Sequence, residues 1–342
     1  MSQGAPFTAD DPNSERIDES ILLINILLFY MKQTFTAEYV SPKHPDKMCD
    51  RISDSILEHF ITQDPNARVA VETLGGHGKV FIVGEVTSLG ILNQIDYESI
   101  VAEITGLDHY ETQVHIARQS PEIAQGVDTG GAGDQGIVIG YACNHNEEMT
   151  PQEYYLAKSL CQYLYRIYPF DGKTQITINN KHEIAVIVAS FQNSKTEQLS
   201  VHIQEWIKDN KCMLDEDIKY FLNSAGEWSI GGFEADAGVT GRKIVIDQYG
   251  PRVPVGGGAF SGKDWTKVDR SGAKYAQHIA QSILREKNAA EVRVELAYGI
   301  GTPQALQSMV YIDGKVQEIN QSQFNTDMSG IKEYLSSLRQ QK

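Results

Sequence analysis

The chain has 342 residues, of which 41% are hydrophobic and 22% charged, and this ordinary globular composition excludes a disordered or fibrous protein. At about 150 residues per domain, this length predicts two or three domains with enough buried surface to need no disulfide or metal support. Asp and Glu exceed Lys and Arg by 45 to 30, and the net charge of −15 argues against nucleic acid or an anionic membrane as a partner. The four cysteines form no CxxC pair, so we expect a reducing, cytoplasmic setting.

Residues 1–30 are interpreted as an N-terminal extension. The apolar run over 21–30 has about half the length of a membrane span, and its acidic upstream flank and missing cleavage site argue against a signal peptide. The sequence from Met31 resembles an ordinary start, so we expect an appendage without a catalytic role.

The first structured region shows a helix, a hairpin and a helix. Apolar residues four apart predict a helix over 46–61, and Pro45 suits its first position. Two β-rich runs follow at 67–74 and 79–87, joined by a glycine-rich turn that is typical of a hairpin. A second helix is predicted over 92–105.

The same order returns about a hundred residues later. Residues 150–153 have the pattern of a capping box ahead of a helix. Strands are predicted at 174–179 and 183–191, and a helix over 196–208.

A third pass begins near residue 267, with a helix over 267–286, strands at 291–299 and 307–312, and a last helix over 328–339. Three such passes predict an α+β fold of three similar helix/β-hairpin/helix units, with mostly antiparallel sheets that carry helices on one face.

The predicted divisions are an extension (1–30), an N-terminal unit (31–125), a central unit (131–229) and a trimmed C-terminal unit (230–342). Between the units, residues 126–140 hold six glycines and residues 226–262 hold ten. Such segments let backbone amides approach anions closely, although ordinary tight turns explain them equally well.

A basic island stands out in this acidic chain. Residues 242–274 carry seven Lys and Arg against three Asp, a local charge of +4. Such a cluster beside glycine turns suits a compact polyanion with several phosphates. A solvated helix face is the alternative, and it is weakest for Arg242 and Lys243, which follow Gly241 and open the β-branched run 244–246.

Several carboxylates occur at positions where a cation with oxygen ligands would balance their charge. His44, Asp46 and Lys47 share one helix N-terminus, a position that also favours anions. Glu72 and Glu85 interrupt apolar strands, which costs free energy unless they are paired or bound to an ion. Further carboxylates in loops or at helix starts are Asp134, Asp171, Asp236 and Asp269. Carboxylates without a thiolate or histidine cluster indicate Mg²⁺ or K⁺ rather than zinc.

Five stretches, in this order, together resemble the S-adenosylmethionine synthetases (methionine adenosyltransferases). They are FTAEYVSPKHPDK (35–47), QSPEIAQGVD (119–128), GAGDQG (131–136), DAGVTGRK (236–243) and GGGAFSGKDWTKVDRS (256–271). The resemblance extends over roughly residues 33–315 and implies three α+β repeats about a pseudo-threefold axis. It also implies an enzyme that joins ATP and L-methionine to form S-adenosylmethionine, and then hydrolyses the released tripolyphosphate to pyrophosphate and phosphate.

The resemblance further implies site residues. The catalytic positions would be His44, Lys173, Asp236, Arg242 and Lys263. ATP would be bound by His44, Asp171, Lys173, Trp228, Asp236, Arg242, Lys243, Ala259 and Lys263. Methionine would be bound by Glu85, Gln119, Asp134, Asp236 and Lys267. Two Mg²⁺ ions per site would use Asp46 and Asp269, K⁺ would use Glu72, and residues 119–130 would close over the site.

The implied chemistry needs no general base, because a thioether sulfur is neutral and already nucleophilic. Alignment of the sulfur with C5′ and neutralisation of the leaving tripolyphosphate would do most of the work. The family builds each site between two subunits, so the expected assembly is a homodimer or a dimer of dimers.

The chain departs from the family at several points. Glu227 and Trp228 stand where Arg-Phe is usual, and tryptophan can still stack on adenine, whereas Glu227 reverses a charge. The loop over 128–131 is shorter than in bacterial members, the run 232–236 is unusual, and the sequence ends at Lys342, before a further segment of the family. These departures leave two alternatives open: an ATP or tripolyphosphate hydrolase, and a catalytically silent regulatory subunit of a full-length homologue.

Overall fold

The computed structural model describes residues 33–89, 95–118 and 130–340. The predicted extension over 1–30, Gln119 and all but the last residue of the predicted loop 119–130 lie outside the described residues.

The first sheet has the strand order β4-β3-β2-β9, and helices α2 and α3 cover it. Its elements are α2 (Pro45–Gln63), β2 (Arg68–Gly76), β3 (Lys79–Thr87), α3 (Tyr97–Thr105), β4 (Glu111–Arg118) and β9 (Gly238–Val239). Strands β3 and β4 are parallel, and the other pairs are antiparallel.

The second sheet has the order β1-β6-β7-β8 and carries helices α5 and α6. Its elements are β1 (Thr34–Val40), α5 (Gln152–Ile167), β6 (Gly172–Asn179), β7 (Ile184–Phe191), α6 (Thr196–Asp209) and β8 (Leu214–Leu222). Only β7 and β8 pair in parallel.

The third sheet is antiparallel throughout, has the order β12-β11-β10-β5, and packs on helices α8 and α9. Its elements are β5 (Gly136–Cys143), α8 (Val268–Lys287), β10 (Glu291–Tyr298), β11 (Ala305–Ile312), β12 (Lys315–Glu318) and α9 (Met328–Gln340). The mixed fold with three mostly antiparallel sheets confirms the predicted fold class.

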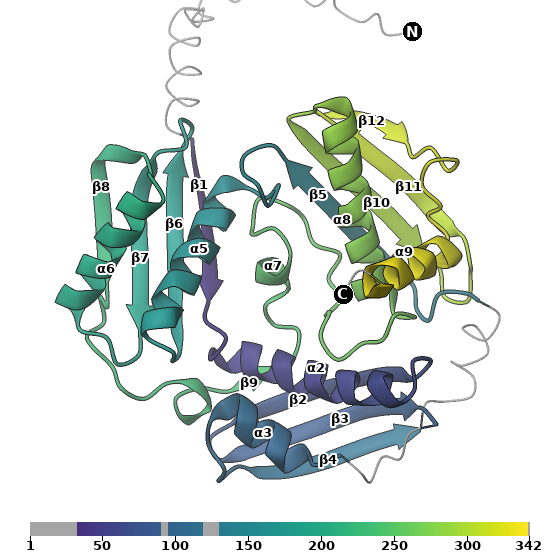
Figure 1. Ribbon diagram of the computed structural model, residues 1–342, viewed down its shortest axis with the longest axis horizontal. Helices are drawn as coiled ribbons and strands as arrows, with labels where there is room; N and C mark the ends of the chain where they lie inside the picture. Colours follow the sequence, from purple (N-terminus) through teal and green to yellow (C-terminus); the bar gives the residue numbers. More distant parts are fainter. Residues whose placement is uncertain (1–32, 90–94, 119–129, 341–342) are drawn as a thin grey trace, which may run out of the picture.

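Each sheet takes a strand from a distant part of the chain. Strand β1 pairs with β6, β5 pairs with β10, and β9 pairs with β2. Figure 1 shows the three sheets arranged around the short helix α7 (Ile244–Asp247), with α2, α5 and α8 on the sides that face it. The predicted pseudo-threefold axis and the unit boundaries stay predictions.

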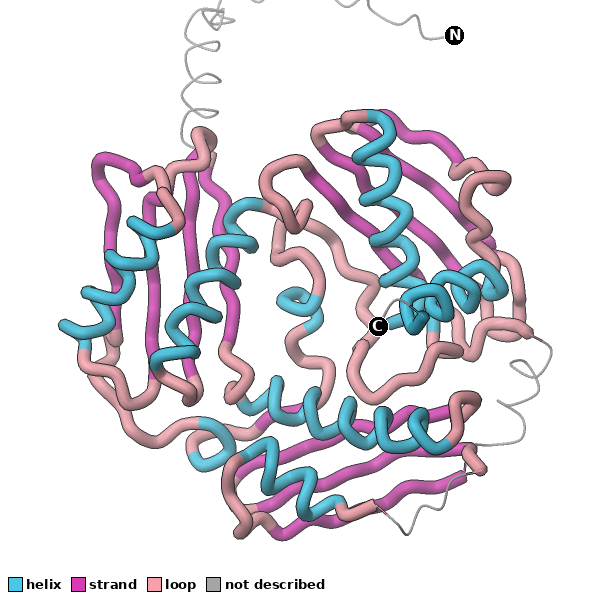
Figure 2. Tube along the Cα trace, viewed as in Figure 1, coloured by secondary structure: helices cyan, strands magenta, loops and turns pink. Residues whose placement is uncertain are grey.

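The sequence patterns missed several elements. The strands β1, β4, β5, β8, β9 and β12 were not expected, and the β-branched run after Lys243 folds as the helix α7. Figure 2 shows that these strands lie beside the predicted hairpins. They depend on long-range pairing, which a local pattern does not report.

The predicted capping box is wrong. Helix α5 begins at Gln152, and its N-cap residue Pro151 makes no side-chain hydrogen bond. Thr150 donates to the Asn146 side chain instead (3.4 Å). Glu153 accepts a hydrogen bond from Arg252 (2.8 Å), so its carboxylate joins distant segments of the chain rather than closing a cap.

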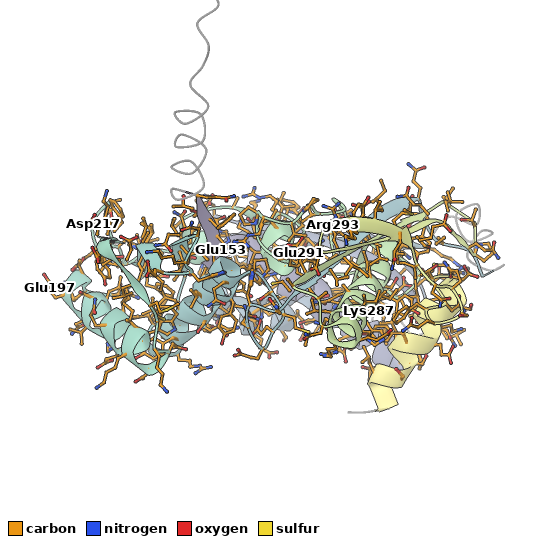
Figure 3. All side chains as sticks on the ribbon, turned by 90° about the horizontal axis from the view of Figure 1, so that it is seen from above. Glu153, Glu197, Asp217, Lys287, Glu291 and Arg293 are labelled. Atoms are coloured by element: carbon orange, nitrogen blue, oxygen red, sulfur yellow. The ribbon has the colours of Figure 1, made fainter. Side chains whose placement is uncertain are left out.

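One face of every sheet packs on helices, and the opposite face is partly open. Large apolar side chains on exposed strand positions include Val83, Ile137 and Leu306, which are 52%, 60% and 68% exposed. The described part of the chain is broad and flat in side view (Figure 3). Within the described ranges, no helix has both the length and the apolar character that crossing a bilayer requires.

Helix α8 packs very closely on strand β5 at Gly140. A Cβ atom there would lie 2.1 Å from the backbone carbonyl of Ala276. We therefore expect Gly140→Ala to destabilise the protein by about 1–3 kcal/mol or more through overpacking, measured by urea and thermal unfolding. The control is Gly136→Ala in the same strand, which meets first the Val268 Cγ2 methyl group at 3.0 Å. Equal losses in the two variants would contradict the close approach as the constraint.

Candidate active site

The N-terminus of α2 places His44 at the edge of the first unit. His44 is the N-cap residue, and its Nδ1 atom accepts a hydrogen bond from the backbone N–H of Asp46 (3.2 Å). The proton of the neutral ring is therefore on Nε2. Burial, followed by the positive charges of Lys243 and Lys173, lowers the pKa of His44 to about 4. His44 is thus a neutral hydrogen-bond donor near pH 7.

Asp46 is fully buried and is held by two cations. Its carboxylate binds Arg242 Nε at 3.0 Å and Lys243 Nζ at 2.5 Å, and accepts from the backbone N–H of Val239 at 3.0 Å. Burial by itself raises the pKa of Asp46, but the hydrogen bonds from Lys243 and Val239 hold it below its usual value. Lys47, which the sequence grouped with this pair, instead binds Asp50 (2.8 Å) and Asp247 (2.6 Å).

The central unit contributes Asp171, Lys173 and Trp228 to the site around His44 and Asp46. Asp171 Oδ2 accepts from the backbone N–H of Gly232 (3.1 Å), and burial raises the pKa of its carboxyl. Trp228 donates from Nε1 to Ser190 Oγ (2.9 Å), and Ser190 is the register partner of Lys173. The charge of Asp236 acts on both His44 and Asp171. We call this group the His44 cluster: His44, Asp46, Asp171, Lys173, Trp228, Asp236, Arg242 and Lys243.

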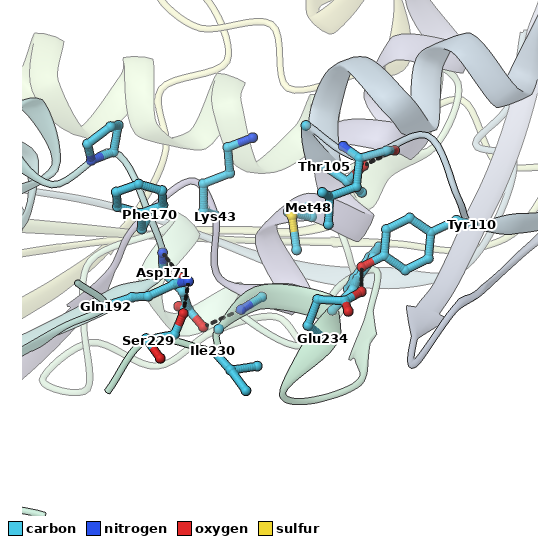
Figure 4. A pocket seen from close by; sticks show the side chains of 16 residues that line it. Lys43, Met48, Thr105, Tyr110, Phe170, Asp171, Gln192, Ser229, Ile230 and Glu234 are labelled. Atoms are coloured by element: carbon cyan, nitrogen blue, oxygen red, sulfur yellow. Dashed lines mark hydrogen bonds between the residues drawn. The ribbon is translucent and has the colours of Figure 1, made fainter. Parts of the chain in front are cut away.

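A cavity of about 480 Å³ adjoins the His44 cluster at Asp171 (Figure 4). Gln192, which the sequence analysis missed, forms part of its wall. Gln192 accepts from the Asp171 backbone N–H (3.3 Å) and donates to the Ser229 carbonyl (2.9 Å), so it ties β6 to the loop after Trp228.

The unusual run 232–236 anchors this loop to the first unit. Phe233 is 1% exposed and belongs to the first unit's core, where it meets Tyr110 edge to face. Glu234 accepts from the Tyr110 hydroxyl (2.5 Å) and lies 3.2 Å from His109 Nε2. The departure from the family pattern was the signal in the sequence, but it did not reveal these partners.

The negative charge of Glu227 is directed away from the cluster. Its carboxylate binds Lys195 (2.9 Å) and accepts from the backbone N–H of Thr196 (3.0 Å), at the first turn of α6. The charge that Glu227 reverses relative to the family is therefore neutralised locally by Lys195.

A second group forms where the loop before α8 crosses the first sheet. Lys263 binds Asp269 (2.7 Å) and bridges to Ala70 of β2, whose register partner on β3 is Glu85. Lys267 binds the buried carboxylate of Asp264 (2.8 Å). We call this group the Lys263 cluster: Glu85, Ala259, Lys263, Asp264, Lys267 and Asp269.

Two backbone approaches shape the Lys263 cluster. A Cβ atom at Gly258 would lie 2.0 Å from the Asp269 carboxyl carbon, so the glycine-rich loop needs its smallest residue there. The backbone N–H of Gly133 donates to Thr266 O (3.2 Å), which brings the exposed Asp134 to the neighbouring loop.

Within one chain the charges of the two clusters are paired separately, although Ala259 packs against Gly241, next to Arg242. Among the described residues, no ion pair joins the His44 cluster to Lys263, Lys267 or Asp269. Glu72 is exposed on the open face of β2, so the predicted cost of burying its charge does not arise. Lys173 is likewise exposed on β6.

The carboxylates suit a cation that takes most of its ligands from elsewhere. No group of three or more His, Cys, Asp or Glu side chains in the described ranges could hold a metal ion. Asp46 and Asp269 each offer a single carboxylate beside lysines. Mg²⁺ commonly binds in this way, with one or two carboxylates, water and substrate phosphates.

Comparisons with known proteins identify the family of the chain. Models of the N-terminal, central and C-terminal domains of S-adenosylmethionine synthetase match residues 32–129, 129–228 and 230–340. An S-adenosylmethionine synthase of Brachyspira hyodysenteriae is 37% identical over 322 residues, covering 82% of this chain and 80% of the relative. One from Prochlorococcus marinus is 38% identical over 340 residues, covering 84% and 82%. A solved structure, described as an unusual S-adenosylmethionine synthetase from Campylobacter jejuni, matches with a TM-score of 0.78 and 31% identity over 88% of both chains. The chain belongs to the S-adenosylmethionine synthetase family.

Proposed function

We propose that this protein is a methionine adenosyltransferase, which forms S-adenosylmethionine from ATP and L-methionine and then hydrolyses tripolyphosphate to pyrophosphate and phosphate. The observation that carries the proposal is the His44 cluster. There, a neutral imidazole donor lies beside a buried carboxylate that already holds Arg242 and Lys243. Such a place suits the triphosphate of a nucleotide.

The transfer step is a displacement at carbon. A lone pair of the methionine sulfur forms the S–C5′ bond, the C5′–O bond breaks, and its electron pair leaves with the tripolyphosphate. The sulfur becomes a sulfonium. Because no proton moves in this step, the site has to align the reactants and stabilise the leaving anion.

The residues of the His44 cluster divide this work. His44 donates from Nε2 to the triphosphate, in a tautomer that the Asp46 backbone N–H maintains. Lys173, Arg242 and Lys243 neutralise the phosphates, with Asp171 and Asp236 nearby. The Trp228 ring, oriented by Ser190, stacks on the adenine.

The Lys263 cluster supplies the other half of the site. Lys263 and Ala259 complete the ATP site, while Glu85 and Lys267 position methionine together with Asp134 and Gln119. Two Mg²⁺ ions at Asp46 and Asp269 would neutralise phosphate charge when bound, and K⁺ would bind near Glu72. The single carboxylates at Asp46 and Asp269 support this assignment.

We also propose that two copies build each site as a homodimer. Within one chain the charges of the two clusters do not pair with each other, and this supports the arrangement, because a second copy can bring its Lys263 cluster to the His44 cluster of the first. The exposed apolar side chains on the open sheet faces, among them Val83 and Ile137, offer a surface for such pairing.

The first experiment is mass spectrometry of the products formed from ATP, L-methionine, Mg²⁺ and K⁺. We expect S-adenosylmethionine, pyrophosphate and phosphate, and none of them when methionine or Mg²⁺ is omitted. Lys263→Ala should lower S-adenosylmethionine formation at least a hundredfold, because a charge that faces the leaving anion is lost. The control is Lys315→Ala, at an exposed position of β12.

Other products would contradict the transferase. Phosphate release without S-adenosylmethionine would favour the hydrolase, and no product at all would favour the silent regulatory subunit. Normal turnover of Lys263→Ala would remove this lysine from the site.

Trp228 gives a prediction about ATP binding. Replacing the indole in Trp228→Ala removes base stacking worth about 1–3 kcal/mol, so the KM for ATP should rise roughly 10- to 100-fold with a smaller change in kcat. Trp228→Phe keeps an aromatic face and should recover most of the affinity. The test is steady-state kinetics with ATP varied at saturating methionine. An equal loss in both variants would assign Trp228 a purely structural role.

The shared site predicts complementation between two inactive variants. His44→Ala and Lys263→Ala should each be inactive alone. In a mixed dimer, one site carries both defects and the other carries neither, so the purified mixed dimer should show about half of wild-type activity. Co-expression with two affinity tags, followed by purification of the mixed dimer, provides the measurement. If the mixed dimer has no activity, each site lies within one chain.

A further inference from the structure

A second, cationic cavity lies on the helical side of β1, apart from both clusters. It measures about 420 Å³, a size that fits a small organic ligand, and it lies between α2 and α5. Strand β1 runs directly into α2, and α5 packs along β1 (Figure 1). Tyr39 of β1 lines this cavity, whereas its neighbours Glu38 and Thr36 line a different cavity that includes Arg242 and Lys243.

Two helix surfaces face this cavity with cationic and polar side chains. Lys47 and Arg51 are four residues apart on α2, and Gln162 and Arg166 are four residues apart on α5. Residues at this spacing lie on one side of a helix, so each helix presents a pair of donors to the cavity.

The charged residues that line the cavity are all positive, although the chain as a whole is strongly acidic. The residues that line it include Lys47, Arg51 and Arg166 and no Asp or Glu. Lys47 is held by Asp50 and Asp247, but Arg51 and Arg166 make no ion pair or hydrogen bond with any described residue. Two exposed guanidinium groups therefore remain available to an external anion.

The acidic groups of the cavity wall carry no negative charge near pH 7. Burial raises the pKa of the Cys161 thiol to about 12. It likewise raises the pKa of the Tyr39 phenol to about 12, against the opposing charge of Lys47. Nothing on the wall thus offsets the two arginines.

The rest of the cavity is apolar or aromatic. Pro42 and Ile246 contribute aliphatic surface, and Tyr39 and Tyr165 contribute rings. Rings of this kind stack on planar groups, while paired guanidinium forks match the oxygens of phosphate.

We propose that this cavity binds a phosphate monoester with a planar body, at a place distinct from the active site. The phosphate lies between Arg51 and Arg166, and the planar body lies against Tyr39 and Tyr165. Arg is the suitable residue here because its fork binds phosphate through two donors. The proposal does not depend on the proposed function, because it concerns binding without turnover.

The test uses phenyl phosphate as the probe, with phenol and inorganic phosphate for comparison, on the full chain. Calorimetry should show binding of phenyl phosphate, weaker binding of inorganic phosphate, and none of phenol. Arg51→Gln/Arg166→Gln should weaken phenyl phosphate at least tenfold, because two charge-assisted hydrogen bonds are lost. The matched control is Arg285→Gln, an exposed arginine near the end of α8, which should change the affinity less than twofold.

Three outcomes would overturn the proposal. They are no binding of phenyl phosphate, unchanged affinity in the double variant, and equal affinity for inorganic phosphate, which would remove the planar body. Arg51 and Arg166 are exposed and unpaired, so we expect the double variant to fold, checked by circular dichroism. If it unfolds, Arg166→Gln alone replaces it and should still weaken phenyl phosphate about tenfold, and unchanged affinity there would also refute the site.

Discussion

The buried carboxylate of Asp46 is the interaction on which the rest of this site depends. A buried charge is costly without partners, and Asp46 finds three in one distant segment: the backbone N–H of Val239, and the side chains of Arg242 and Lys243. Its own N–H binds His44 Nδ1, which settles the tautomer of that ring. One residue thus pins strand β9 to α2, gathers the cations and prepares the imidazole. Loss of one of these partners would leave the Asp46 carboxylate buried without compensation. The same interactions therefore stabilise the fold and hold the site residues in place.

Local patterns in the sequence predicted the parts of the fold that are local. The helices α2, α5 and α8 and the three hairpins follow from apolar spacing and turn residues, and the structure confirms them. Strand β5 was missed because its two glycines read as turns, whereas Gly140 in fact allows α8 to pack close. Strands β1 and β9 were missed because their partners lie far along the chain. Glu72 shows a related limit of local patterns. Buried and exposed residues alternate along its strand β2, but the sequence does not show that the face of the sheet carrying Glu72 is left uncovered.

The site divides in the same way. The motifs pointed to these residues as candidates, yet they did not show how the fold pairs their charges into two clusters. Gln192 carries no signal of its own, and the unusual run that holds Phe233 and Glu234 did not show their partners, because these roles arise from contacts between units. Asp264 counted only as one charge of the basic island, although it is the buried partner that holds Lys267. A pattern of residue types reports chemistry, whereas the pairing of charges depends on the fold.

The two cationic places in this acidic protein differ in how their charges are balanced. At the His44 cluster, Arg242 and Lys243 are already partly neutralised by the Asp46 carboxylate. An incoming anion is therefore attracted only by the positive charge that remains. A polyanion that contacts several cations at once, and brings metal ions of its own, can still bind there. At the cavity between α2 and α5, Arg51 and Arg166 have no internal anion to displace. A ligand with a single phosphate is therefore enough to bind at this cavity. The two sites thus differ in the ligand charge that each requires, because their cations differ in whether they are already paired.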